Sequence, residues 1–247
     1  MDLIGAISVV RKSVVAILRY RLVRSETKKK TKVRPAKYKA GWGSGFCIVT
    51  DRYIVTAFHV LSDAQHRNQS DRFVAFVVPD NDDPAYHFPV IGYPVERPDL
   101  DLAVLEIGQC TTAGIQLPAV PVTFAAQHDG SRVLTIGFPA PEIAGLNIDS
   151  DGNYIGGQFF LKSHANEGIL SAQYLLGHAP VYEFNVGWHH GESGGPVLRL
   201  EDPVAAFTVM QQYRSIQSPY GVVAGPHRGC ALSSIRQDIQ RLGAQVL

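Results

Sequence analysis

The sequence predicts an all-β protein made of two six-stranded antiparallel β-barrels, followed by a C-terminal α-helix. Three observations lead to this fold class. From Trp42 onward, short apolar runs alternate with turn residues, which is typical of the many short strands of a barrel or sandwich. The length of 247 residues suits one large all-β domain. Only the last segment changes to a helical period.

The chain begins with a short apolar segment and then a first strand. Residues 2–12 predict a lead-in helix, and Ser13–Leu18 predicts a strand because this run is apolar and rich in β-branched residues. Lysines and arginines crowd residues 24–39, and this segment is interpreted as a long solvated loop. Docking of the same segment to an acidic partner or to anionic lipid is the alternative.

The strands that follow are expected where apolar runs are bounded by turn residues. They are Gly45–Thr50, Tyr53–Ala57, Phe73–Val78, Leu102–Ile107, Arg132–Gly137, Gly168–Ala172, Val181–Val186, Pro196–Leu200, Val204–Gln211 and Gly221–Ala224. Residues 139–166 are rich in Gly, Pro, Asp and Asn, so we expect a large loop there. The final helix is expected over residues 235–243, capped by Ser234, because Ile235 and Ile239 recur on one face.

Composition limits the functional classes. Hydrophobic residues make up 45% of the chain and charged residues 18%, which predicts a sizeable core and argues against global disorder. The net charge of +1 argues against nucleic acid as a partner. No run approaches the roughly 20 apolar residues of a membrane-spanning helix, and the N-terminus lacks the pattern of a secretory signal. These features predict a cytoplasmic protein without a membrane span.

The three cysteines, Cys47, Cys110 and Cys230, do not form a disulfide framework, because their number is odd and their spacing shows no pairs. Each lies in an apolar, strand-like context, so we expect small buried hydrophobes. Free cysteines of this kind favour a reducing compartment.

Three motifs carry candidate catalytic residues. His59 lies within Thr56–Val60, two aspartates, Asp99 and Asp101, precede an apolar strand, and Ser193 lies within His190–Pro196. A serine hydroxyl is a weak nucleophile and needs an adjacent base. Histidine can take its proton, while a carboxylate fixes the histidine tautomer. The motifs therefore predict nucleophilic catalysis by serine.

The glycines around Ser193 indicate how the reaction would be assisted. They let the backbone turn tightly and approach a substrate closely, so the N–H groups of Gly191 and Ser193 can face a developing oxyanion. The same residues also satisfy the G-x-S-x-G pattern of α/β-hydrolases. That alternative requires a helix directly after the serine, whereas Pro196 and the β-like Val197 and Leu198 follow here.

The pair His189–His190 raises the question of a metal site. Adjacent residues of a strand face opposite sides, so one ion is not expected to bind both. No other Cys or His spacing in the chain indicates a metal site. We therefore predict no metal and no cofactor.

The motifs together resemble the chymotrypsin-fold (trypsin-like, clan PA) serine proteases, and the resemblance is nearest to the bacterial HtrA/Deg-type protease domain without its PDZ domain. It covers residues 13–243. The segments that carry it, besides the three motifs, are Ser13–Ile17, Gly43–Phe46, Asp101–Leu105, Leu134–Pro139, Gly168–Ala172 and Gly229–Ile235. In the family frame the acid directly precedes an apolar-Ala-apolar-Leu strand, so the resemblance implies Asp101 rather than Asp99.

The resemblance implies two barrels with the site in the cleft between them. A division near residues 121–130 gives an N-terminal barrel over 13–125 with His59 and Asp101, a C-terminal barrel over 126–232 with Ser193, and a helix over 233–247. The implied substrate pocket is lined by Gly187, Trp188, His189, His190, Thr208, Val209, Met210 and Gln211. No acid stands near position 187, so we expect a preference for small or medium apolar residues.

Two departures from the resemblance concern activation. Residue 192 is Glu, where HtrA enzymes commonly have Asn and trypsin-like enzymes have an Asp that pairs with a new N-terminus. No Ile-Val-Gly-Gly activation motif is present, so the partner of Glu192 is open. The position of the family's "TDA" aspartate is occupied by Asn185.

The sequence therefore predicts a serine endopeptidase that acts on a protein or peptide through an acyl-enzyme. A variant of this hypothesis is a latent enzyme that an activating protein partner switches on, with segments 24–39 and 139–166 as the switches. The alternative is a non-catalytic or chaperone-like binding module on a protease scaffold.

Overall fold

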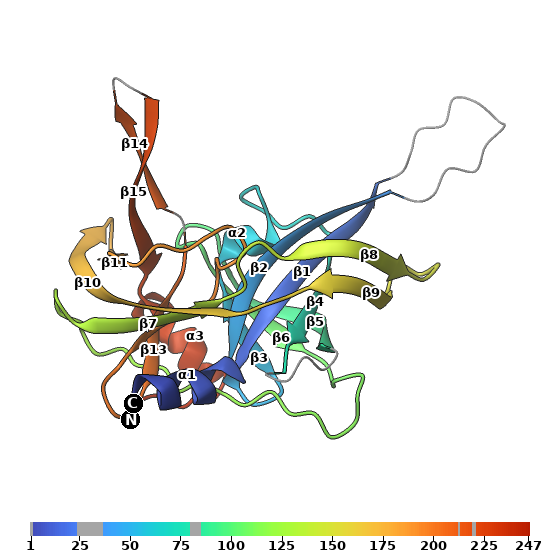
Figure 1. Ribbon diagram of the computed structural model, residues 1–247, viewed down its shortest axis with the longest axis horizontal. Helices are drawn as coiled ribbons and strands as arrows, with labels where there is room; N and C mark the ends of the chain where they lie inside the picture. Colours follow the sequence, from blue (N-terminus) through green and yellow to red (C-terminus); the bar gives the residue numbers. More distant parts are fainter. Residues whose placement is uncertain (1, 24–36, 80–84, 212, 219–220) are drawn as a thin grey trace.

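A computed structural model of the protein describes residues 2–23, 37–79, 85–211, 213–218 and 221–247 (Figure 1). Most of the basic segment expected as a loop, residues 24–36, lies outside the described residues. The end of that segment, 37–39, is not a loop but the start of a strand. No helix in the described part of the chain is long and apolar enough to cross a membrane.

The first half of the chain forms a closed antiparallel barrel of six strands in the order β1–β2–β3–β6–β5–β4, as predicted. The strands are β1 (Val14–Val23), β2 (Lys37–Val49), β3 (Tyr53–Thr56), β4 (Arg72–Val77), β5 (Tyr86–Arg97) and β6 (Leu102–Ile107). The long strand β5 was not predicted. Its pairing with β6 shifts register between Val90 and Gly92 and again before Val95, and such bulges interrupt the alternation that marks a strand.

The apolar run that opens β1 is explained by burial on both faces of the strand. Val15 and Ile17 belong to one apolar cluster with other barrel residues. Ala16 and Leu18 belong to a second cluster, which also contains Leu134 from the other half of the chain. A strand that is buried on both faces needs apolar residues at successive positions, so β1 joins the barrel interior to the core between the two halves.

The second half of the chain forms a seven-stranded sheet in the order β13–β12–β7–β10–β11–β15–β14. Its strands are β7 (Arg132–Gly137), β10 (His164–Leu176), β11 (Ala179–Phe184), β12 (Pro196–Arg199), β13 (Ala205–Val209), β14 (Tyr213–Ser218) and β15 (Gly221–Cys230). This sheet stands in place of the second closed six-stranded barrel. Strand β14 pairs with β15 in a hairpin that projects from the body (Figure 1), and an isolated bridge from Thr208 to Ala231 joins β13 to the chain after β15.

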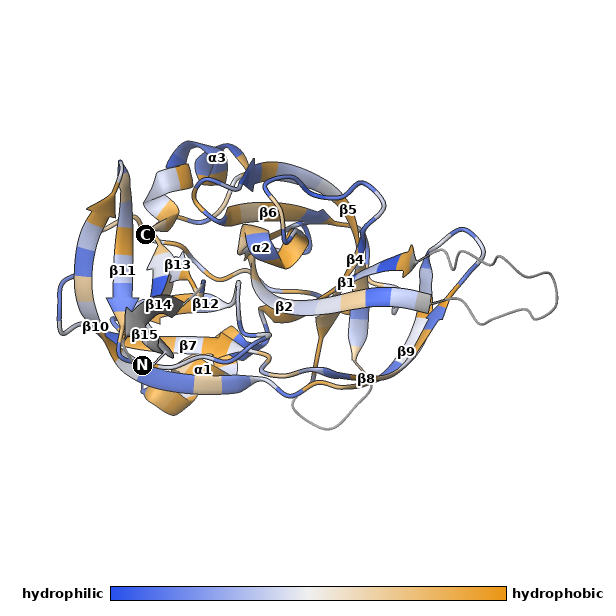
Figure 2. Cartoon of the chain, turned by 90° about the horizontal axis from the view of Figure 1, so that it is seen from above, coloured by the Kyte–Doolittle hydropathy of each residue, from blue (hydrophilic) through white to orange (hydrophobic). Residues whose placement is uncertain are grey.

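Hydropathy follows the position of each strand. Strand β7 is mostly hydrophobic in Figure 2, and five of its six residues are buried. Hydrophilic and hydrophobic residues alternate along β10 in the same view, and of its residues Leu170 alone is buried. The alternation is expected for a strand with one solvated face.

The expected loop over residues 139–166 is wrong. The segment contains a hairpin of β8 (Glu142–Ile148) and β9 (Tyr154–Phe160), and it ends within β10. Its aromatic residues pack on the first barrel: the ring of Phe159 lies 5.4 Å from that of Trp42, and the ring of Tyr154 lies 5.4 Å from that of Phe76. Glycine-rich composition suggested a loop, but these contacts stabilise paired strands.

The two terminal helices differ in how well they were predicted. Helix α1 (Leu3–Arg11) confirms the lead-in helix, and the carboxylate of Asp2 caps it by accepting from Gly5 N at 2.7 Å. At the other end, a 3-10 turn η1 (Leu232–Ile235) precedes α3 (Arg236–Arg241), and Ser234 is not the cap. Leu232 and Ile235 are both buried, and the three-residue period of a 3-10 turn places them on one face.

All three cysteines are free thiols. Cys47 and Cys230 are buried, as expected, whereas Cys110 is half-buried. Burial raises the pKa of the Cys47 thiol to about 12. A thiol with so high a pKa is protonated at neutral pH and unreactive, so Cys47 packs as a small hydrophobe.

Candidate active site

His59 lies on the short helix α2 (Phe58–Leu61), which directly follows β3. The helix begins after Ala57, whose backbone is extended. Val60 packs so closely on Gly43 of β2 that a β-carbon at Gly43 would lie 2.4 Å from both Val60 γ-methyl groups. The glycine before the histidine hairpin is therefore required by a close approach, and this approach positions the turn that carries His59.

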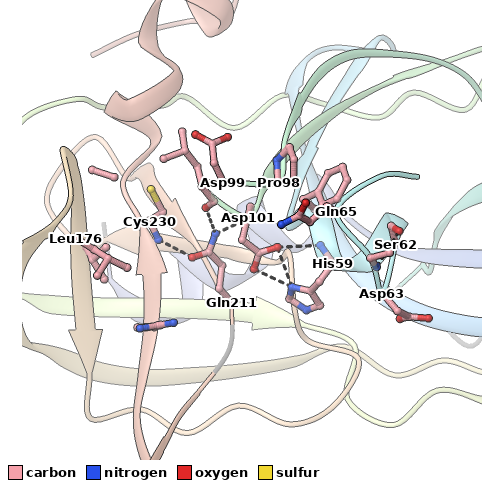
Figure 3. A pocket seen from close by; sticks show the side chains of 16 residues that line it. His59, Ser62, Asp63, Gln65, Pro98, Asp99, Asp101, Leu176, Gln211 and Cys230 are labelled. Carbon is pink, nitrogen blue, oxygen red and sulfur yellow. Dashed lines mark hydrogen bonds and ion pairs between the residues drawn. The ribbon is translucent and has the colours of Figure 1, made fainter. Parts of the chain in front are cut away.

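Asp101 ends the turn between β5 and β6 and contacts His59 directly (Figure 3). His59 Nδ1 lies 2.8 Å from Asp101 Oδ2 and 3.1 Å from Oδ1, and the main-chain N–H of His59 donates to Oδ1 at 2.8 Å. The carboxylate therefore orients both the backbone and the ring of His59. An acceptor at Nδ1 keeps the proton there and leaves Nε2 free to act as a base.

The other candidate acid, Asp99, is engaged elsewhere. Its carboxylate forms a two-bond pair with Arg97, with distances of 2.9 and 2.7 Å. The hydrogen bond from Arg97 lowers the pKa of Asp99, which is mostly exposed. The structure thus brings Asp101, and not Asp99, to His59.

Ser193 lies in the turn that leads into β12. Ser44, on strand β2 of the first barrel, forms hydrogen bonds to this turn. Ser44 N donates to Ser193 O at 2.7 Å, and the Ser44 hydroxyl donates to Gly191 O at 2.8 Å and accepts from Phe138 N at 2.9 Å. Ser44 is completely buried. It was not among the predicted site residues, although it stands in the Gly43–Phe46 segment that carried part of the resemblance.

The backbone around Ser193 leaves two N–H groups available. The carbonyl of His190 accepts from Ala140 N at 2.7 Å, and the carbonyl of Glu192 accepts from Gly195 N at 3.0 Å. In a trans peptide the C=O and N–H point in opposite directions, so the N–H groups of Gly191 and Ser193 point away from these acceptors. Neither donates to another group within the described residues. Free N–H pairs of this kind can bind an oxyanion.

The Ser193 hydroxyl makes no hydrogen bond to His59 in the part of the chain that the structure describes. In unliganded enzymes such a bond is often long and tightens when substrate binds. His59 and Asp101 are partly exposed, with 30% and 26% of their side-chain surface accessible. They border a cavity of about 650 Å³ that is lined from both halves of the chain, for example by Pro98 and Leu176 (Figure 3).

Most of the residues expected to line the substrate pocket lie in the core instead of on an open surface. Thr208, Val209 and Met210 have no exposed surface, and Trp188 is only 6% exposed. Gln211 is 7% exposed, but it borders the cavity beside His59. The exposed members of the set are Gly187, His189 and His190. Trp188 packs on Phe184 and His227, with ring centroids 5.9 and 4.5 Å apart, and its Nε1 donates to Gln211 O at 2.8 Å.

The sequence left the partner of Glu192 open. In the structure its carboxylate is bound mainly by the main-chain N–H of His189, in the turn that precedes it. His189 N donates to Glu192 Oε2 at 2.5 Å, and Asn166 Nδ2 lies 3.5 Å from Oε1. The side chain is completely buried. Burial raises the pKa of Glu192, and the His189 hydrogen bond opposes this shift only in part.

The raised pKa predicts how Glu192 affects stability. The folded protein binds this proton more tightly than the unfolded chain, so the contribution of Glu192 is present below its ordinary pKa of 4.5 and is lost as pH rises through the raised value. We expect the free energy of unfolding of Glu192→Gln, relative to wild type, to increase across this range. Urea denaturation at a series of pH values measures it.

The matched control is Glu142→Gln, which changes an exposed glutamate in the same way. It shows how the loss of one surface carboxyl affects the same measurement. A difference for Glu192→Gln that does not vary with pH would mean that the Glu192 carboxyl ionises as readily in the folded protein as in the unfolded chain.

Gly194 is a second point where the serine turn meets the first barrel. A β-carbon there would lie 2.1 Å from Ser44 O and 2.2 Å from Thr56 Oγ1, and φ is +89°. We expect Gly194→Ala to lower the free energy of unfolding by more than about 3 kcal/mol, since overpacking adds to the cost of a left-handed backbone. Gly130→Ala is the control, because Gly130 has φ of +87° and nothing within 4 Å. Equal losses in the two variants, measured by denaturant unfolding, would contradict the steric argument.

A closed β-barrel, a second antiparallel sheet and a His–Asp pair at the edge of the barrel are features of the chymotrypsin-type fold. Residues 43–205 match the family described as the trypsin-like peptidase domain. The chain belongs to this family.

Solved structures agree on the fold. The crystal structure of Deg5 superposes with a TM-score of 0.60 at 18% sequence identity, covering 95% of this chain and 90% of that one. The HtrA-type protease AlgW with a decapeptide gives a TM-score of 0.62 at 16% identity, covering 99% of this chain and 68% of that one. A comparison with curated proteins finds no match.

Proposed function

We propose that the protein is a serine endopeptidase. The observation that carries the proposal is the contact of Asp101 with both the ring and the main chain of His59. The free N–H groups at Gly191 and Ser193 support it, because they lie in a turn that is bonded to Ser44 of the same barrel. A base with a fixed tautomer and a preorganised oxyanion site are the two elements that acyl transfer needs.

In the proposed mechanism, Ser193 Oγ attacks the carbonyl carbon of a peptide bond while His59 Nε2 takes its proton. The tetrahedral oxyanion accepts hydrogen bonds from the N–H groups of Gly191 and Ser193. His59 then protonates the leaving amine, which departs and leaves an acyl-enzyme on Ser193. Water, deprotonated by His59, hydrolyses this ester and restores the serine. None of these steps requires a metal or cofactor.

The substrate is proposed to be a protein or peptide that enters the cavity beside His59. The preference for small or medium apolar residues stays a prediction, and so does a cytoplasmic location. The missing hydrogen bond between Ser193 and His59 supports a resting state that substrate or an activating protein partner completes. It is also the observation that favours the second candidate, a binding module without catalysis.

Labelling with a fluorescent fluorophosphonate tests the proposal. This reagent reacts covalently with a serine that an adjacent base activates. We expect wild type to be labelled and Ser193→Ala to remain unlabelled. Absence of labelling in folded wild type, with and without peptide substrate, would favour the binding module.

A further inference from the structure

The side chain of Gln211, just after β13, reaches from the second sheet to the turn that carries Asp101 (Figure 3). Its Nε2 donates to Leu100 O at 3.0 Å and to Asp101 O at 2.7 Å. Its Oε1 accepts from Cys230 N on β15 at 2.8 Å. The side chain is 93% buried, since 7% of the residue surface is accessible.

The orientation of this amide is unambiguous. A flipped amide would place its oxygen against the carbonyls of Leu100 and Asp101 and its NH₂ against the N–H of Cys230. All three contacts would then be repulsive, and a buried polar group without a partner is costly. The three hydrogen bonds therefore hold Gln211 in one arrangement.

The turn to which Gln211 donates these two hydrogen bonds has a strained backbone that they stabilise. Asp101 has φ of +54°, in the left-handed region that is unfavourable for a residue with a β-carbon. The main-chain bond that closes the turn, from Asp101 N to Pro98 O, is long at 3.3 Å. The Asp101 carbonyl also accepts from Phe58 N at 3.1 Å. Gln211 thus adds two bonds from outside the barrel, one to each of the two peptide groups that flank the α-carbon of Asp101.

The residue before Gln211 is joined to the serine turn. Gly194 N donates to Met210 O at 2.7 Å, and Met210 N donates to Gly195 O at 2.8 Å. Positions 210 and 211 therefore hold the serine turn through the main chain and the aspartate turn through a side chain. Within this one segment, the two turns that carry Ser193 and Asp101 are linked.

We propose that Gln211 is a positioning residue that fixes the Asp101 turn relative to the serine turn and so sets the approach of Asp101 to His59. This inference rests on the proposed serine endopeptidase function. Gln211 touches no reacting atom. Its side chain also borders the cavity beside His59, so the positioning role is additional to the pocket-lining role that the resemblance implied. Displacement of a catalytic group by about 1 Å can reduce turnover on the order of 10²-fold.

The test uses Gln211→Met, which keeps the shape and removes every hydrogen bond of the amide. The spectroscopic readout is the far-downfield ¹H signal of the His59 Nδ1 proton bound to Asp101, with Asp101→Asn as the reference for its loss. We expect this signal to weaken or vanish in Gln211→Met. We also expect kcat to fall on the order of 10²-fold with KM nearly unchanged.

Thr208→Val is the matched control. Thr208 lies on β13, three residues before Gln211, and its hydroxyl donates to Cys230 O at 2.6 Å. The variant therefore also removes a buried hydrogen bond between β13 and β15. It does not touch the Asp101 turn, and the His59 signal should persist. A general loss of packing would affect both variants alike.

A folded Gln211→Met with the wild-type His59 signal and kcat would overturn the proposal. If this variant does not fold, Gln211→Glu decides in the same way, because it keeps an acceptor for Cys230 N and loses both donated bonds. Labelling and the His59 signal test the peptidase function and the positioning role separately. If wild type is labelled and the His59 signal is the same in wild type and Gln211→Met, the positioning role alone is overturned. An unlabelled wild type whose signal depends on Gln211 supports the positioning role and overturns the peptidase.

Discussion

Replacing Ser193 by alanine is expected to reduce kcat for peptide hydrolysis by a factor of about 10⁴–10⁶. The change removes the one oxygen that forms the acyl-enzyme. It leaves the backbone intact, so the bond from Ser44 N to Ser193 O and the free N–H groups of the turn are retained. The fold and the oxyanion site should therefore survive, and the loss reports on the nucleophile itself.

The measurement is turnover of an internally quenched peptide library under conditions that label the wild type. Ser8→Ala is the control, because it makes the same chemical change at an exposed position of α1. Its turnover should equal that of wild type. Hydrolysis that persists in Ser193→Ala at the wild-type rate would assign the nucleophile to another residue.

Replacing Asp101 by asparagine is expected to lower kcat by about 10⁴-fold with the fold intact. The carboxylate accepts from both His59 N and His59 Nδ1. An asparagine NH₂ facing Nδ1 would donate to it, so the ring proton would move to Nε2. The nitrogen that should accept the Ser193 proton would then already carry one.

Asp99→Asn is the matched control for the loss of kcat expected in Asp101→Asn. The two aspartates are two positions apart, and the spacing of residues alone left both open as the catalytic acid. Asp99 pairs with Arg97 and does not reach His59, so its replacement should change turnover little. Assays of kcat for both variants decide between them. A large loss in Asp99→Asn with a small one in Asp101→Asn would contradict the assignment.

The local part of this site was predictable because each motif is contained in a few consecutive residues. The histidine after a short apolar strand, the aspartate before another and the serine between glycines are visible without knowledge of the fold. Most strands were also predictable, because their alternation or continuous apolar character is local. Strand β5, the β8–β9 hairpin and strand β14 were missed. For β5 and the hairpin the structure shows why. Bulges near Gly92 interrupt the period of the first, and the second depends on the packing of Phe159 and Tyr154 against the barrel.

The expected pocket shows where pattern alone is insufficient. The family resemblance implied that Thr208, Val209 and Met210 line the substrate pocket, but all three are fully buried in the core. Gln211 has a polar side chain that contacts the aspartate turn. The residues adjacent in sequence do not distinguish the contact of Gln211 with the aspartate turn from the core positions of the three residues before it.

By itself the sequence determined the fold class, the order of the three motifs and the identity of the candidate nucleophile and base, because these depend on residues adjacent along the chain. The family resemblance had already favoured Asp101 over Asp99. Only the tertiary structure showed the contact of Asp101 with His59, gave Glu192 its partners Asn166 and His189, and joined the two halves through Ser44 and Gln211. The contacts of Ser44 and Gln211 cross 147 and 110 positions of the chain, respectively. Such pairs come together through barrel closure and sheet packing, which no local pattern encodes.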